Sequence, residues 1–271
     1  MSFDPPFPPP RSKFQALRGL GLSAVLTLSF LYFYQAHYEV PILMYHHVDK
    51  AAEKFGNTVS PETFERQMEF LKVHRYQVIS LHELVEKIRS GETLPAKAVA
   101  ITFDDGNLDN MENAFPVLKR MGFPATVFMI TSNIDQEGSL SEEDLKILDG
   151  SGITIGSHTD HHAFLPERDS SFVMTELTES KKKLEKVLGH PVDLLSYPAG
   201  GVTSEVRSLV QKAGYVGAVT TNYGRERKDP YALHRIKISE AKGSLWNFWA
   251  KLSGIYLVGK KKIKMLGEAT G

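Results

Sequence analysis

A regular alternation of short apolar runs and segments with helical spacing dominates the chain from Val40 onward. The apolar runs, rich in β-branched and aromatic residues, are typical of buried strands and fall at residues 40–48, 76–81, 98–103, 125–130, 153–157, 194–198, 217–222 and 234–238. Helical spacing of apolar side chains marks the segments between them, at residues 60–74, 109–122, 141–152, 171–189 and 204–214. Strands that alternate with helices form parallel sheets, and seven or eight such units predict a distorted (β/α) barrel.

Composition narrows the classes of partner and site. The 271-residue chain carries 32 basic and 32 acidic residues, so no global charge would attract nucleic acid, and we expect no nucleic acid partner. There are no cysteines, which excludes disulfides and thiolate metal sites. Any metal must therefore be held by histidine and carboxylate side chains.

An uncharged apolar run, Gly19–Tyr34, follows a proline-rich, basic N-terminus. Positive charges before the run and none directly after it predict a cytoplasmic N-terminus and an exported remainder. We expect a cytoplasmic tail at residues 1–15, a signal-anchor transmembrane helix at residues 16–36, and one extracytoplasmic domain at residues 37–271. A cleaved signal peptide is the alternative, although the residues before Ala36 match a cleavage site poorly.

Two adjacent carboxylates, Asp104 and Asp105, end the strand predicted at residues 98–103. Successive side chains of a strand point to opposite faces, so both can share one pocket only if the strand ends there. Gly106 supplies the backbone freedom for such an ending. The alternative is that one aspartate caps the following helix while the other is solvated.

Three histidines, His158, His161 and His162, follow the strand predicted at residues 153–157. The carboxyl ends of parallel strands meet at one edge, so these imidazoles should lie near the two aspartates. One aspartate and two histidines would form a metal site with positions open for water and substrate. One of the three histidines is then expected to be a bystander.

The segments TFDDG, SHTDHH and YPAGG, in this order, resemble the polysaccharide deacetylases of the NodB-type homology domain, which are metal-dependent carbohydrate esterases. This resemblance implies an N-acetylated amino-sugar polymer as substrate and Asp104 as the general base. It also implies that Asp105, His158 and His162 bind one divalent metal ion, zinc first, with nickel, cobalt or iron as alternatives. His161 is then the bystander.

The third segment departs from the commonest form of the family. Ser196 and Ala199 stand where many members have an arginine and a tyrosine, and the sequence here resembles the branch of poly-β-1,6-N-acetylglucosamine deacetylases. The resemblance places the backbone N–H of Ala199, together with Tyr197, at the substrate and its oxyanion. A peptidoglycan or other N-acyl amidase and a non-catalytic glycan-binding subunit of the envelope are the competing functions.

The chain lacks the arginine and the late histidine motif that are usual in the family. Two roles therefore stay open: the general acid and the residue that orients Asp104. The general acid is predicted to be His234, or else His46 or His47, or Asp104 returning its proton. For the missing arginine we expect Arg235, at the start of the last predicted strand, to make a bidentate contact with Asp104 and to orient it. The alternative is a structural arginine paired with another carboxylate.

The C-terminal region carries both tryptophans of the chain, Trp246 and Trp249. Their spacing predicts a terminal helix on which they pack against the barrel, with a sugar-binding platform as the alternative. A lysine-rich tail follows, for which an exposed end and proximity to anionic lipid are the two interpretations.

Overall fold

The structure, a computed structural model, describes residues 25–30, 32, 39–50, 56–95, 97–221, 229–240 and 244–253. The chain divides into two units, Met1–Tyr38 and Glu39–Gly271. The predicted tail and most of the predicted membrane span lie outside the described residues. Residues 25–30 are helical and exposed, and no described helix combines the length and apolar character needed to cross a bilayer.

A nine-stranded parallel sheet organises the second unit. Its strands are β1 (Ile42–Tyr45), β4 (Gln77–Val78), β5 (Ala98–Phe103), β6 (Ala125–Met129), β7 (Ile153–Ser157), β8 (Leu194–Ser196), β9 (Gly217–Thr220), β10 (Leu233–His234) and β11 (Ile236–Lys237). They run in the order β10-β9-β8-β7-β6-β5-β1-β11, with β4 paired to β5. A separate two-stranded sheet joins β2 (His47–Val48) to β3 (Thr58–Val59).

The last strand segment closes the sheet into a barrel. β10 pairs with β9, β11 pairs with β1, and Arg235 alone separates β10 from β11. The Arg235 N–H donates to the Thr220 carbonyl at 3.1 Å, while the Ile238 N–H donates to the Met44 carbonyl at 3.0 Å. With β10 and β11 counted as one, seven strands close the ring and β4 adds an eighth, which confirms the predicted distorted barrel.

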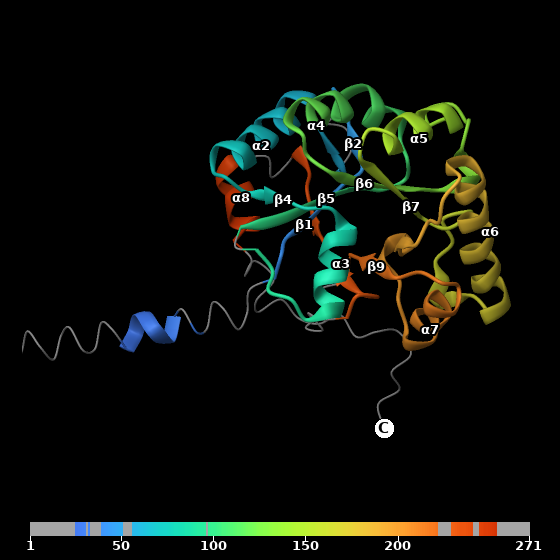
Figure 1. The fold of residues 1–271 in the computed structure, drawn as a ribbon. Helices are drawn as coiled ribbons and strands as arrows, with labels where there is room; N and C mark the ends of the chain where they lie inside the picture. Colours follow the sequence, from blue (N-terminus) through green and yellow to red (C-terminus); the bar gives the residue numbers. More distant parts are fainter. Residues whose placement is uncertain are drawn as a thin grey trace, which may run out of the picture. The chain divides into compact units, whose positions relative to one another are not determined.

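Helices cover the barrel on the outside (Figure 1). They are α2 (Pro61–Val73), α3 (Leu81–Ser90), α4 (Phe115–Met121), α5 (Glu142–Asp149), α6 (Ser170–Leu188), α7 (Ser204–Lys212) and α8 (Leu245–Lys251). Short helical turns are η1 (Asn110–Ala114), η2 (Thr131–Asn133), η3 (Leu165–Glu167) and η4 (Pro198–Gly200). Several long helices begin where a side-chain oxygen accepts a backbone N–H, as Ser60 does for α2, Ser141 for α5 and Asp169 for α6.

Helix α3 was not among the predicted helices, because its first turn overlaps the strand predicted at residues 76–81. The structure shortens that strand to β4 and starts the helix at Leu81, where the Ser80 side chain accepts the Glu83 N–H. The helix ends at Gly91, whose φ of 72° lies in the left-handed region that glycine adopts without strain.

Two apolar clusters hold the helices to the barrel. One unites β1, β5, β6 and β7 with α2, α4, α5 and α8, and includes Phe64, Leu118 and Phe248. The other unites β8 and β9 with α6 and α7, and includes Leu177 and Val210. Removing this apolar surface from water supplies the main favourable term for closing the fold.

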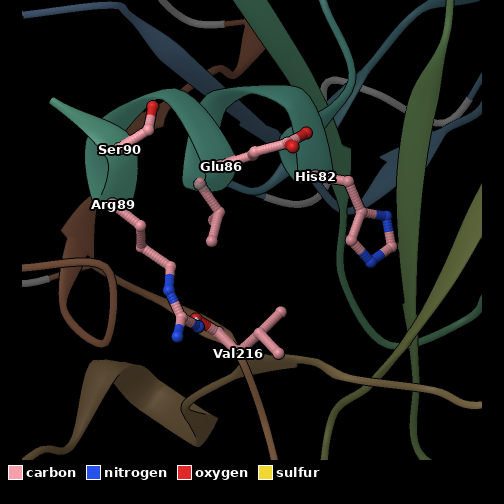
Figure 2. A pocket seen from close by; sticks show the side chains of 6 residues that line it. His82, Glu86, Arg89, Ser90 and Val216 are labelled. Carbon is pink, nitrogen blue, oxygen red and sulfur yellow. The ribbon is translucent and has the colours of Figure 1, made fainter. Parts of the chain in front are cut away.

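A surface cavity of about 440 Å³ lies between α3 and the start of β9 (Figure 2). Helix α3 presents His82, Glu86, Arg89 and Ser90 to it, and Val216 lies opposite, where Arg89 Nη1 donates to the Val216 carbonyl at 3.2 Å. Because Val216 directly precedes β9, this cavity is at the amino-terminal ends of the strands. Barrels of this kind carry their chemistry at the carboxyl-terminal ends.

Candidate active site

Polar side chains converge at the carboxyl-terminal ends of neighbouring strands. Asp104 and Asp105 follow β5, His158 follows β7, Ser196 ends β8 and His46 follows β1. Because these strands are parallel and adjacent or nearly so in the sheet, their last residues share one rim. The structure therefore brings together carboxylates and imidazoles that the sequence spreads over more than a hundred residues.

The predicted metal ligands lie together. One ligand atom from each of Asp105, His158 and His162 falls within 4.8 Å of the others. The Nε2 atoms of His158 and His162 are 3.5 Å and 3.8 Å from the same Asp105 oxygen. A carboxylate oxygen and two imidazole nitrogens in this cluster suit a divalent cation such as zinc.

Backbone geometry explains how two adjacent aspartates share the pocket. Asp105 has a φ of 73° and Gly106 a φ of 74°, so the chain turns sharply where β5 ends instead of continuing as a strand. A side chain at Gly106 would also collide with Met129, whose sulfur lies 2.0 Å from the position of a Cβ atom. Gly106 is thus required twice, once by its backbone conformation and once by close packing.

A hydrogen bond fixes the orientation of His158. Its Nδ1 lies 2.8 Å from the Ser196 carbonyl oxygen, which can only accept, so Nδ1 carries the proton and the Nε2 lone pair is left for a metal. Burial lowers the pKa of His158, against the opposing effect of Asp104 and Asp105. Both observations favour the neutral imidazole that binds metals.

His161 faces away from this cluster. Its backbone N–H donates to Glu176 on α6 at 2.8 Å, and its ring Nδ1 lies 2.8 Å from the other oxygen of the same carboxylate. The neighbouring Asp160 is held by Thr131 Oγ1 at 2.6 Å and by Lys183 Nζ at 2.7 Å. His161 is thus placed as a bystander, and the segment from His158 to His162 is tied down from outside the cluster.

Asp104 and Arg235 make the predicted bidentate contact. Arg235 Nη1 and Nη2 donate to the two carboxylate oxygens of Asp104, each at 2.6 Å. The guanidinium also donates to Thr102 Oγ1 at 3.2 Å and to Ser196 Oγ at 2.8 Å. Asp104 and Arg235 are almost fully buried, so the pair is shielded from solvent.

The charge state of Asp104 follows from these neighbours. Burial by itself raises the pKa of a carboxyl group, but the charge and the hydrogen bonds of the Arg235 guanidinium outweigh that effect and hold the pKa of Asp104 well below its usual range. Asp104 Oδ2 is 3.9 Å from His158 Nε2. An ionised carboxylate that is held by Arg235 therefore lies beside the metal ligands without belonging to them.

The prediction for Tyr197 is corrected. Its side chain is fully buried in the cluster between β8 and α7, and its hydroxyl donates to the Tyr231 carbonyl at 2.9 Å. From this position the ring cannot contact a substrate. Ala199, in contrast, is exposed at the end of β8 with a left-handed φ of 51°, which is unusual for a residue other than glycine and reorients its peptide.

The histidines proposed as general acid occupy different environments. His234 ends β10 directly before Arg235 and is half-buried, and its assignment as the acid stays a prediction. His47 Nδ1 donates to Asp109 at 2.7 Å, which raises the pKa of His47. His46 has Asp104 and Asp105 among its charged neighbours, while burial lowers its pKa.

Sequence reasoning did not identify Ser196 and Glu176 as parts of the site. Ser196 stands where the resemblance places the arginine of many family members, and here its hydroxyl accepts from Arg235, between β10 and β11. This departure from the family motif was the one feature of the sequence that could have pointed to Ser196. Glu176 lies within a helix of ordinary composition, and nothing local marks it.

Comparisons with known proteins agree with this geometry. A family model described as Polysaccharide deacetylase matches residues 91–218. YxkH of Bacillus subtilis, provisionally named a polysaccharide deacetylase, is 36% identical over 74% of this chain and 72% of its own length. A poly-β-1,6-N-acetyl-D-glucosamine N-deacetylase of Staphylococcus aureus is 26% identical over 86% of this chain and 83% of its own. Among solved structures, the Streptococcus pyogenes deacetylase PplD in complex with acetate has a TM-score of 0.73 and 27% identity, covering 79% of this chain and 98% of that one.

Proposed function

The chain belongs to the polysaccharide deacetylase family, and on this premise we propose that it is a metal-dependent hydrolase that removes N-acetyl groups from an N-acetylglucosamine polymer of the cell envelope. The observation that carries the proposal is Asp104. It is ionised, held by Arg235 and adjacent to a potential metal triad that does not use it. A protein that merely bound glycans would have no need of such a carboxylate.

The donor set fits a single divalent cation, with Asp105, His158 and His162 as its ligands. Zinc is our first choice, and nickel, cobalt and iron accept the same donors. When bound, such an ion supplies Lewis-acid polarisation of the acetamide carbonyl and lowers the pKa of water. The hydrogen bond from His158 Nδ1 to Ser196 holds one ligand ready for it.

Asp104 is assigned the role of general base. Its carboxylate takes a proton from the attacking water, and the bidentate contact with Arg235 keeps it from turning onto the metal. Because the pKa of Asp104 is held below its usual range, the base is ionised throughout the neutral pH range.

Two further groups complete the assignment. The N–H of Ala199, at the reoriented peptide after Pro198, is the donor proposed for the developing oxyanion. The proton must then reach the departing amine nitrogen. Asp104 can return it directly or through His46, the candidate histidine on this rim that interacts with both aspartates.

Acetate release tests the proposed function. The full chain, loaded with zinc, is offered β-1,6-linked and β-1,4-linked N-acetylglucosamine oligomers and peptidoglycan, with and without a chelator. We expect acetate from an N-acetylglucosamine oligomer, loss of release with chelator, and recovery with added metal. Release from peptidoglycan alone would favour the competing amidase function. Release from none of them would leave a glycan-binding role.

For location, we propose that residues 16–36 anchor the protein and that residues 37–271 lie outside the cytoplasm. The support is the charge asymmetry around the apolar run Gly19–Tyr34. A reporter that is active only outside the cytoplasm should be active when fused after Gly271. An inactive reporter, or a soluble form that begins near His37, would contradict the anchor or its orientation.

A further inference from the structure

The two tryptophans of the chain lie on the surface, where packing against the barrel was predicted. Trp246 and Trp249 are 71% and 45% exposed. They sit on α8, whose buried face is formed by other residues, Phe248 and Lys251 among them. Leaving two indole rings in water forfeits much of the free energy available from burying them. Such exposure indicates a surface that contacts something else.

Helix α8 packs beside the C-terminal half of α2. The Phe248 ring meets the Phe70 ring edge-on at 5.8 Å, and Phe70 in turn stacks on His74 at 3.9 Å. Figure 1 shows α8 next to α2 and β4. The residues that end α2 therefore adjoin the helix that carries both tryptophans.

The end of α2 is basic and exposed. Lys72 and Arg75 are exposed there, and between them Val73 is 75% exposed. Lys97 is also exposed, and its Nζ donates to the His74 carbonyl at 3.4 Å, which adds a third cation to the same region. Glu69 is an exposed acidic residue one turn earlier on α2. Positive charge therefore predominates at the end of α2 that adjoins α8.

We propose that Trp246 and Trp249, with the flanking cations Lys72, Arg75 and Lys97, dock on the surface of an anionic lipid bilayer. We call these five residues the tryptophan face. Tryptophan rings favour the boundary between lipid headgroups and acyl chains, and lysine and arginine side chains near a bilayer are attracted to anionic lipids. Four more lysines follow α8 in the sequence, at positions 260, 261, 262 and 264, with one acidic residue, Glu268.

A sugar platform fits the geometry less well. The two rings lie 4.8 Å apart with an angle of 32° between their planes, so each covers part of the other's face. A platform for consecutive sugar units needs ring faces that stay open. The cations at the adjoining end of α2 also match an anionic surface better than a neutral N-acetylated polymer.

Docking of this face would orient the enzyme. Arg75 precedes β4 and Lys97 precedes β5, so both lie at the amino-terminal ends of the strands, whereas the candidate active site lies at the carboxyl-terminal ends. A bilayer at the tryptophan face would leave the site directed away from the lipid, toward polymer outside the membrane. The inference does not depend on the proposed deacetylase activity.

Intrinsic fluorescence gives a direct test, because Trp246 and Trp249 are the only tryptophans of the chain. The full chain is combined with phosphatidylcholine bilayers or with bilayers that also contain phosphatidylglycerol, each made with and without brominated acyl chains. We expect blue-shifted emission and quenching by brominated lipid in the anionic bilayers. High salt should reduce both effects, because it screens the attraction of the cations.

A triple variant, Lys72→Gln, Arg75→Gln and Lys97→Gln, should lose most of the dependence on anionic lipid. A matched variant with Lys182, Lys186 and Lys212 changed to glutamine, all exposed on α6 or α7, should keep it. Unquenched emission that is the same in all bilayers would overturn the proposal. So would emission that shifts only when N-acetylglucosamine oligomers are added, which would assign the face to glycan. Both readouts are independent of acetate release.

Discussion

At the scale of single residues, the adjacent Asp104 and Asp105 differ in the side chains that they contact. Asp105 lies among imidazole nitrogens, whereas Asp104 is clamped by a guanidinium. The left-handed turn at Asp105 and Gly106 makes this division possible within one dipeptide. Each aspartate therefore has a distinct mutational signature.

Asp104→Asn should keep its metal and lose roughly 100-fold or more of the rate, because the amide cannot accept the proton of the water. Asp105→Ala should lose metal and rate together. Metal content by elemental analysis, alongside acetate release, distinguishes the two. Near-normal rates for Asp104→Asn would place the base elsewhere.

Arg235→Lys should keep the metal while losing rate, since an ammonium group cannot reproduce the two parallel hydrogen bonds. The weaker contact should let the pKa of Asp104 rise, so the acidic limb of the pH–rate profile should move to higher pH. A merely structural arginine would not move that limb. An unchanged profile in a folded, metal-loaded variant would contradict the positioning role.

His46→Gln should slow the reaction without loss of metal if the proton reaches the amine through His46. His47→Gln is the matched control, because the neighbouring ring is engaged by Asp109. A lower kcat for His46→Gln than for His47→Gln at saturating metal would support proton transfer through His46. Equal, near-normal rates would leave Asp104 to return the proton itself.

At the scale of elements, α6 supports the loop that carries the candidate metal ligands His158 and His162. Glu176 holds both the backbone and the ring of His161, and Lys183 holds Asp160. Between them these contacts secure a loop in which Thr159 and His162 have left-handed φ values of 66° and 56°. A loop with such strained residues keeps its shape only when its surroundings impose it.

Glu176→Gln should weaken metal binding by at most roughly 10-fold, the lower end of the range for groups that hydrogen-bond a ligand directly, because Glu176 holds the neighbouring His161 and not a ligand itself. Glu179→Gln, one turn along α6, is the control, because the Glu179 side chain accepts from Lys182 and not from His161. His161→Ala should bind metal more tightly than Glu176→Gln, because the backbone N–H of residue 161 can still donate to Glu176. Competition with a chromogenic chelator measures the affinities. Equal metal affinities for Glu176→Gln and Glu179→Gln would show that the loop from His158 to His162 keeps its shape without Glu176.

At the scale of the whole molecule, barrel closure and the buried ion pair of Asp104 depend on the same residue, Arg235. Arg235 lies between β10 and β11, which join the two edges of the sheet. Its side chain meanwhile reaches β5 through Asp104 and Thr102, and β8 through Ser196. Correct closure is therefore a condition for the contact that orients Asp104.

Arg235→Met should destabilise the metal-free protein by about 3–5 kcal/mol, the range for a buried charge left without its partner. In this variant burial raises the pKa of Asp104, so the deficit should be largest near neutral pH and shrink as the pH falls and Asp104 is protonated. Adding Asp104→Asn should restore part of the loss. Urea unfolding with chelator measures these differences, and a deficit independent of pH would contradict the explanation.

The sequence by itself determined the barrel class and the cluster of potential metal ligands. Alternating strands and helices admit few architectures, and parallel strands bring their carboxyl ends to one rim whatever the loops between them do. The Asp-Asp-Gly and Ser-His-Thr-Asp-His-His segments follow such strands, so their meeting required no knowledge of long-range packing.

Only the tertiary structure decided what surrounds those side chains. Arg235, the partner of Asp104, lies 131 residues away in the sequence. The sequence suggested this pair but could not exclude that Arg235 contacts a different carboxylate. The burial of Tyr197, the exposure of Trp246 and the support from Glu176 were likewise beyond reach, since each depends on which helix covers which strand. Local pattern specifies where a side chain leaves the backbone, whereas the packing of distant elements specifies what it meets.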